Sequence, residues 1–280
     1  VADVICQHSP GAVTKTKQDN VRALVVGLAP ELQAQYAKAG LTPEAIDSGA
    51  LILTGVAVRR RNARAIADLF AGQAGKFVSV SAGDALETTL AAFGSGAAAR
   101  SIRESARVMN IDIGGGTTKI AVCESGELVD LTAIDIGARI VALDDHGCVV
   151  RIEEAGCRFA AEVGVLLETG RPVSDEDMQR MAMLMADRIF EACGVHEPSG
   201  QTLSLLRLPA LKGRRLPDVL TFSGGVSEYI YGRQPASFGD LGPLLAQAVL
   251  TKAQAWGPRL EVPDQGIRAT VIGASQYTVQ

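Results

Sequence analysis

Three consecutive glycines, Gly114 to Gly116, follow an apolar stretch and a single acid. The apolar residues 107–113 predict a buried strand that brings the carboxylate of Asp112 to the rim of a sheet. Because glycine has no Cβ, the amide N–H groups of such a turn can converge on an anion. Thr117 adds a hydroxyl at the same place. The pattern favours a phosphate chain with Mg²⁺, in which Asp112 holds the metal through water molecules.

Two familiar phosphate loops do not match this turn. No Gly-Lys-Ser/Thr opens a helix here, so it is not a Walker A loop, and the G-x-G-x-x-G spacing is absent as well. The alternative interpretation is an ordinary glycine hairpin. Such a hairpin needs only one or two glycines and no preceding acid.

A second glycine cluster lies in residues 220–227, where an apolar strand runs into Gly224 and Gly225. Two glycines after a strand allow a flat group or a phosphate to lie directly on the backbone. Alone, this pattern also fits a plain strand-to-helix turn. Together with the first cluster, it favours a nucleotide site built from two separate segments.

Composition excludes several classes of protein. The chain has 280 residues, of which 47% are hydrophobic, so it can build a core and is not expected to be disordered. Its net charge of −4 argues against a nucleic-acid partner. No apolar run reaches the roughly 18 residues of a membrane span, so no membrane association is expected. The five cysteines form no C-x-x-C pair, and residues 1–20 lack a signal peptide, which favours a cytoplasmic protein with reduced thiols.

The order of expected elements suggests an α/β protein with two parts. Before residue 106, strands and helices alternate, which predicts a layer with parallel strands; the strands are 50–55 and 76–80 and the helices 20–39, 62–70 and 84–93. After residue 106, hairpin spacings predict an antiparallel meander of strands 107–113, 117–123 and 128–134. The remaining expected elements are a hairpin over 140–152, helices 155–167, 174–192 and 241–256, a loop over 195–217, and strands 219–222 and 269–272. Residues 94–99 are expected to be a connector of small residues.

The two glycine motifs together resemble the signatures of the actin, Hsp70 and sugar-kinase superfamily. Residues 112–117 are similar to its second phosphate motif, residues 223–226 to its adenosine motif, and residues 269–274 to its last connecting segment. The resemblance implies an α/β, actin/Hsp70-like (ribonuclease H-like) two-lobed ATPase fold. Residues 1–105 would be the remainder of the first lobe, and residues 106–280 the second lobe, with the last segment returning to the lobe interface. The implied nucleotide-binding residues are Asp112, Gly114, Gly115, Gly116, Thr117, Thr118, Gly224, Gly225 and Val226, with Asp112 also at the metal.

Within that superfamily, the chain resembles the ethanolamine ammonia-lyase reactivating factors along nearly its whole length. The similar segments are residues 47–55, 61–64, 79–83, 110–117, 220–226, 240–246 and 268–274. The resemblance implies a cytoplasmic, ATP- and Mg²⁺-dependent chaperone that acts on ethanolamine ammonia-lyase. It would release damaged cobalamin so that adenosylcobalamin, the cofactor of the lyase, can rebind. Nucleotide-driven opening and closing of the two lobes is the implied mechanism; a homodimer and association with a bacterial microcompartment are left open.

One family motif has no counterpart in the sequence. Members begin with a first phosphate motif of the Asp-Ile-Gly-Thr-Thr-Thr type, and nothing like it precedes Val1. We therefore expect a chain without its first phosphate strands, and no general base can be assigned. Residues 135–137 superficially repeat the motif, but without the threonine, and are interpreted as the end of the third strand. Three other functions stay open: a small-molecule kinase, an actin-like filament protein and a nucleotide-binding module without hydrolysis.

Overall fold

The computed structural model describes residue 34, residues 36–42, residue 45, and residues 49–53, 77–81 and 83–277. Contacts group the chain into two compact units, Val1–Gly83 and Asp84–Gln280. In the first unit, strands β1 (Gly49–Leu53) and β2 (Phe77–Ser81) pair in parallel, which confirms the parallel strands expected there. The helix expected over residues 62–70 lies outside the described residues. Of the helix expected over 20–39, residue 34 and residues 36–39 are described and are helical.

The second unit contains a mixed five-stranded sheet. Its elements in chain order are α5 (Asp84–Gly94), α6 (Ala97–Arg103), β3 (Val108–Ile113), β4 (Thr118–Glu124), β5 (Glu127–Ile134), β6 (Val141–Leu143), β7 (Val149–Ile152), α7 (Glu154–Glu162), α8 (Asp175–Ala192), α9 (Gly200–Leu205), β8 (Val219–Ser223), α10 (Ser227–Ile230), α11 (Gly242–Trp256), β9 (Arg259–Glu261) and α12 (Ala269–Tyr277). The order across the sheet is β5-β4-β3-β8-β9. The meander β3-β4-β5 is antiparallel, as predicted, whereas β8 pairs in parallel with β3 and β9 with β8.

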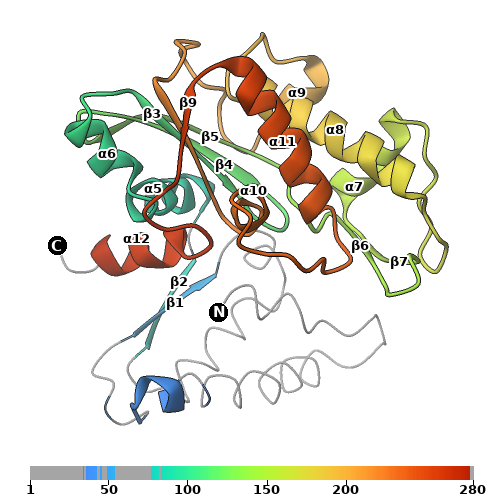
Figure 1. Cartoon of the computed structure of the whole chain (residues 1–280), viewed down its shortest axis with the longest axis horizontal. Coiled ribbons are helices and arrows are strands. Elements are labelled where there is room, and N and C mark those ends of the chain that lie inside the picture. The colour runs from blue at the N-terminus through green and yellow to red at the C-terminus, as the bar shows by residue number, and fades with distance from the viewer. Residues whose placement is uncertain are drawn as a thin grey trace. The chain divides into compact units, whose positions relative to one another are not determined.

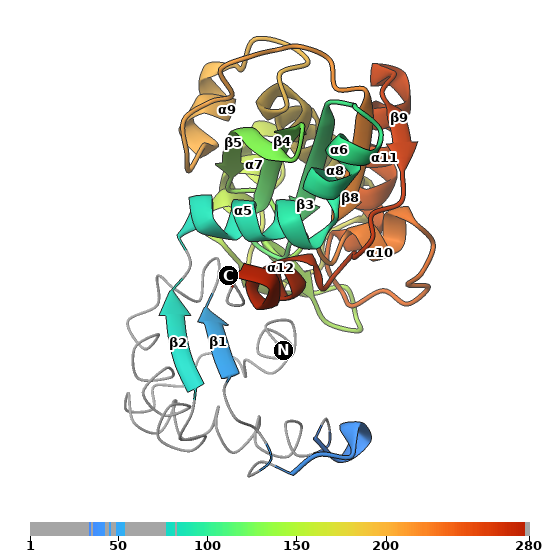
Figure 2. The ribbon, with the colours of Figure 1, turned by 90° about the vertical axis from the view of Figure 1, so that its left-hand side faces the viewer.

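Helices cover both faces of this sheet. Helices α8 and α11 lie on one face, where Met181 and Met185 share a core with Ile111 and Phe222 (Figure 1). Helices α5 and α6 lie on the other face, seen from the front in Figure 2. The methionine stripe of α8 is therefore core packing, as its helical spacing indicates. The Ser174 hydroxyl caps α8 by accepting a hydrogen bond from the Asp177 amide at 3.1 Å.

Residues 269–272 form a helix, so the strand expected there is wrong. Helix α12 crosses α5 so closely that a Cβ at Gly273 would collide with the Leu90 carbonyl, and one at Gly94 with the Ala269 carbonyl. Two glycines thus let two helix backbones touch. The small residues noted in the sequence serve this crossing, although the type of element was mispredicted.

Three further differences concern short elements. Helix α6 begins inside the expected small-residue connector, after Gly96, whose φ of 81° suits glycine. The expected loop over 195–217 contains α9, which is capped by the Ser199 hydroxyl. Strand β9 was not expected, because three residues are too few for a periodic signal. The hairpin of β6 and β7 is confirmed.

Candidate functional site

The two glycine motifs leave the sheet from neighbouring strands. Strands β3 and β8 are parallel, and Asp112 lies directly opposite Ser223 in their register. Both strands are buried along their whole length, because helices cover both sheet faces. Their carboxyl ends therefore reach the same edge of the sheet, and Asp112 is 6% exposed there. This edge is where ligands bind in open α/β sheets.

A direct hydrogen bond joins the second motif to the first. The Val226 amide donates to the Ile113 carbonyl at 3.2 Å. Gly224 has a φ of +80°, and a Cβ on it would lie 2.5 Å from the same carbonyl oxygen. Only glycine fits this position, because it tolerates both the left-handed conformation and the close approach. Gly225 has open space around it and is half-buried.

The glycine turn after β3 is compact but accessible. The Gly114 amide donates to the Thr117 carbonyl at 3.0 Å and closes the turn. Gly114, Gly115 and Gly116 are half-buried, whereas Thr117 and Thr118 are buried. Thr118 donates its hydroxyl to the Ile136 carbonyl at 2.7 Å, and Thr117 accepts a hydrogen bond from Lys119 at 2.6 Å.

The segment after β5 supports the glycine turn from the other side. The Ala138 amide donates to the Gly114 carbonyl at 3.0 Å, and the Arg139 amide to the Gly115 carbonyl at 2.6 Å. A Cβ on Gly137 would collide with the Gly116 amide nitrogen. Residues 135–137 were interpreted as the end of the third strand, but β5 ends at Ile134 and these residues pack on the turn. The available sequence signal for this contact was that residues 135–137 repeat the Asp-Ile-Gly of residues 112–114.

A chain of buried polar side chains runs between β3 and β8 and ends at Asp112. The Thr221 hydroxyl donates to Asn110 Oδ1 at 2.9 Å, and Asn110 Nδ2 donates to Ser223 Oγ at 2.9 Å. Ser223 then donates to Asp112 Oδ2 at 2.6 Å. These bonds fix the orientation of the Asp112 carboxylate, as outer-shell partners do for metal ligands. Sequence reasoning missed Asn110, Thr221 and Ser223 as site residues. Their polar alternation within two otherwise apolar strands was the available signal.

Residues 200–207 brace the same edge of the sheet. Arg207 makes a bidentate contact with Asp84 at 2.8 and 2.7 Å, and its Nη1 also contacts Asp135 at 2.9 Å. The Asp135 amide donates to the Leu205 carbonyl at 3.0 Å. Bidentate arginine–carboxylate pairs are geometrically specific. The start of α5 and the segment that packs on the glycine turn are thus held by one guanidinium.

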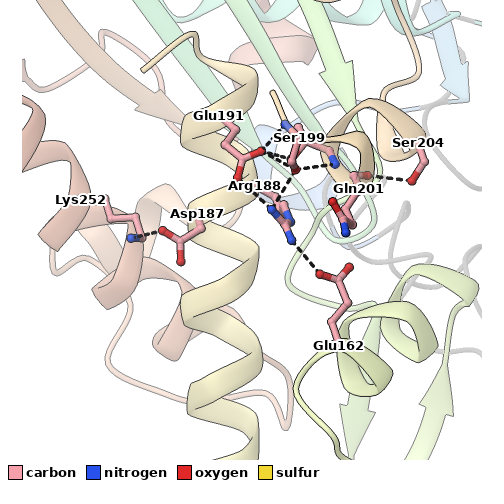
Figure 3. A network of polar contacts seen from close by, with 9 residues as sticks. Glu162, Asp187, Arg188, Glu191, Ser199, Gln201, Ser204 and Lys252 are labelled. Atoms are coloured by element: carbon pink, nitrogen blue, oxygen red, sulfur yellow. Dashed lines mark hydrogen bonds and ion pairs between the residues drawn. The ribbon is translucent and has the colours of Figure 1, made fainter. Parts of the chain in front are cut away.

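A second polar network holds α9 on α8, and Figure 3 shows it from close by. Glu191 Oε2 accepts from the Ser199 amide at 2.8 Å, from the Ser199 hydroxyl at 2.7 Å and from the Thr202 hydroxyl at 2.5 Å. Arg188 bridges Glu191 and Glu162, each at 2.8 Å (Figure 3). Burial raises the pKa of the Glu191 carboxyl, but the hydrogen bonds from Thr202, Ser199 and Arg188 outweigh burial and lower its pKa to about 2.

The site suits a cation that keeps most of its water ligands better than one that is coordinated by protein side chains alone. Among the residues that the structure describes, no group of three or more His, Cys, Asp or Glu side chains could enclose a metal ion. Mg²⁺ commonly keeps several waters and binds through one or two carboxylates together with substrate phosphates. An oriented carboxylate next to a half-buried glycine turn fits that pattern.

None of the helices in the described part of the chain has the length and apolar composition that a membrane span requires.

Comparison with known families settles the affiliation of the chain. The family model of the ethanolamine utilisation protein EutA matches residues 13–280. The chain belongs to the EutA family. Two curated EutA proteins, both named ethanolamine ammonia-lyase reactivase, are similar to it. The one from Salmonella typhimurium is 37% identical over 94% of this chain and 55% of its own length, and the one from Escherichia coli is 36% identical over 88% and 53%.

The chain thus spans about half the length of the curated EutA proteins that it matches. Among solved structures, an exopolyphosphatase-like protein superposes with a TM-score of 0.53 at 10% sequence identity, covering 96% of this chain and 89% of that one. At this identity the likeness concerns the fold alone. It confirms the α/β, actin/Hsp70-like fold that the two glycine motifs predict, and this EutA-family chain has that fold.

Proposed function

We propose that this chain is part of an ATP-dependent chaperone that reactivates ethanolamine ammonia-lyase. It would release damaged cobalamin from the lyase, so that adenosylcobalamin can rebind. Two observations support the proposal: the 36–37% identity to reactivases, and the hydrogen bond from Val226 to the Ile113 carbonyl. The identity supports the role in reactivation. The hydrogen bond supports a single nucleotide site, because it joins two motifs that are far apart in the sequence at one edge.

The proposed nucleotide lies along this edge. The glycine turn at Gly114–Gly116, with Thr117, would receive the phosphates on bare backbone, as anion-binding nests do. Thr118, whose hydroxyl donates to the Ile136 carbonyl, would hold the end of the turn on the segment after β5. Gly224, Gly225 and Val226 would lie against the adenosine. Gly225 has no described atom within 4 Å of an added Cβ, which leaves room for a flat group.

The proposed Mg²⁺ ligand is Asp112, acting through water. When bound, the ion would neutralise charge on the phosphates. Ser223 holds the Asp112 carboxylate in one orientation through its 2.6 Å hydrogen bond. No general base is assigned.

The proposed coupling to the lyase uses two nucleotide states. A ligand shifts a conformational equilibrium only by its differential affinity for the two states, so the ATP and ADP forms must bind the lyase differently. The lobes expected from the sequence, residues 1–105 and 106–280, stay a prediction. Because α5 and α6 pack on the sheet of the second unit, the proposed moving parts are the compact units Val1–Gly83 and Asp84–Gln280.

Reactivation of an inactivated lyase tests this function. Lyase blocked with cyanocobalamin is mixed with adenosylcobalamin, ATP, Mg²⁺ and the full-length protein, and recovery of ethanolamine deamination is measured. We expect Asp112→Asn to slow recovery roughly hundredfold, the order of magnitude for losing one electrostatic contact to reacting groups. Asp145→Asn, at an exposed aspartate of the β6–β7 turn, is the matched control and should reactivate at the parental rate. Equal rates for Asp112→Asn and the parent contradict the assigned role.

A further inference from the structure

A buried ion pair lies next to the glycine turn, and none of the contacts proposed above uses it. Lys119 on β4 is directly opposite Asp112 in the strand register, and Asp112 is opposite Ser223. These three side chains therefore form one row across the sheet, on the face that α5 covers. Lys119 is 3% exposed, and its partner Glu87 on α5 is 5% exposed.

Both contacts of the Lys119 ammonium are short. Its Nζ donates to Glu87 Oε1 at 2.5 Å and to Thr117 Oγ1 at 2.6 Å. A buried ammonium is costly unless it is paired and hydrogen-bonded, so these contacts fix its position. The glycine turn and helix α5 are thereby connected through one side chain.

The chemistry of these contacts sets the role of the threonine. An ammonium has three donors and no acceptor, so Thr117 Oγ1 must accept in its bond to Lys119. The hydrogen of the hydroxyl is then left for a different acceptor. A neighbouring positive charge also polarises the hydroxyl and strengthens any bond that it donates.

We propose that Lys119 is a positioning residue for the phosphate chain. It holds Thr117 Oγ1 as an acceptor, so that the hydroxyl donates its hydrogen to a phosphate oxygen at the glycine turn. Glu87 balances the lysine charge and keeps the ammonium on the inner side of the threonine. This inference rests on the proposed function, because it requires a nucleotide phosphate at the turn.

The test replaces both members of the Lys119–Glu87 ion pair together. The double variant Glu87→Leu/Lys119→Met replaces both groups by apolar side chains of similar size, a change that buried pairs often tolerate. Thr117→Val removes the hydroxyl and nearly keeps the shape, whereas Thr117→Ser keeps the hydroxyl. Asp187→Asn/Lys252→Met removes an ion pair between α8 and α11 and is the matched control. Calorimetric titrations of the full-length protein with ATP, and separately with adenosine, give the affinities.

We expect the Glu87→Leu/Lys119→Met variant to bind ATP about tenfold more weakly, equivalent to about 1.4 kcal/mol, and to bind adenosine as the parent does. Thr117→Val should show a similar loss, and Thr117→Ser should bind ATP more tightly than Thr117→Val. Adding the double variant to Thr117→Val should cause no further loss, because Lys119 acts through the hydroxyl. The control pair should bind ATP with parental affinity.

Parental ATP affinity in the double variant overturns the inference. The inference is also overturned if the double variant weakens ATP binding equally in the parent and in Thr117→Val, which lacks the hydroxyl. If the double variant does not fold, the single variants still decide, because equal ATP affinities of Thr117→Val and Thr117→Ser overturn the inference. These outcomes leave ATP binding by the parent intact. A parental protein that binds no ATP contradicts the proposed function itself.

Discussion

Glu191 controls the acid stability of the contact between α8 and α9. Its pKa of about 2 lies well below the ordinary value of 4.5. Because the folded-state pKa is lowered, the carboxylate stabilises the fold fully above about pH 4.5, and this contribution is lost as pH falls toward 2. At 1.36 kcal/mol per pH unit, the difference corresponds to ~3 kcal/mol at neutral pH.

The substitution Glu191→Gln tests this contribution. The amide removes the charge and, with its oxygen accepting from Ser199 and Thr202, turns its NH₂ group toward the Arg188 guanidinium, so we expect a loss of about 2–3 kcal/mol in the free energy of unfolding at pH 7. The side chain is only 17% exposed, so solvent screens this effect little. By pH 3.5, linkage predicts that the parent has lost roughly 1.4 kcal/mol of its advantage over the variant.

Chemical denaturation at pH 7 and at pH 3.5 measures both quantities. Glu168→Gln, at a half-exposed glutamate that pairs with Arg171, is the control and should change stability by less than about 0.5 kcal/mol at either pH. If the difference in free energy of unfolding between the parent and Glu191→Gln is the same at the two pH values, the lowered pKa of Glu191 is contradicted.

Two glycine substitutions test the close approaches that shape the site and its supporting helices. Gly224→Ala forces a Cβ against the carbonyl at the end of β3 at a φ of +80°, so we expect a loss of about 1–3 kcal/mol, measured by chemical denaturation. Gly225→Ala, in open space, should keep parental stability, and an equal loss in both variants would contradict the packing argument. Gly273→Ala should separate α12 from α5 at Leu90 and speed hydrogen exchange of α12 amides. Gly200→Ala, also in open space, is its control, and unchanged exchange in Gly273→Ala would contradict the crossing.

Much of the fold could be predicted because its strands are short apolar runs bounded by glycine. Residues 107–113 and 219–222 are such runs, and each ends at a glycine cluster. These two strands, however, pair across a sequence separation of about a hundred residues, and local sequence patterns do not show which residues lie opposite each other. The bond between Val226 and Ile113 could therefore be inferred only through a family resemblance.

The missed features share a physical cause, which is dependence on tertiary contacts. Residues 269–272 contain β-branched side chains that fit a strand as well as a helix, and packing of Gly273 on α5 decides for the helix. Lys119 interrupts an apolar strand, but nothing near it in the sequence indicates that Glu87, on the preceding helix α5, is its partner. The Asp-Ile-Gly segment at residues 135–137 was noticed, yet its contact with the glycine turn required the sheet to be assembled.

The proposed function requires that one site, built from Asp112 and the two glycine motifs, binds ATP in the service of lyase reactivation. Phosphate release from ATP by the full-length protein, measured with and without cyanocobalamin-blocked lyase, tests it most directly. We expect blocked lyase to stimulate phosphate release by the parent, and we expect Asp112→Asn to abolish this stimulation. Phosphate release that does not respond to the lyase, or that responds equally in Asp112→Asn, would contradict the account.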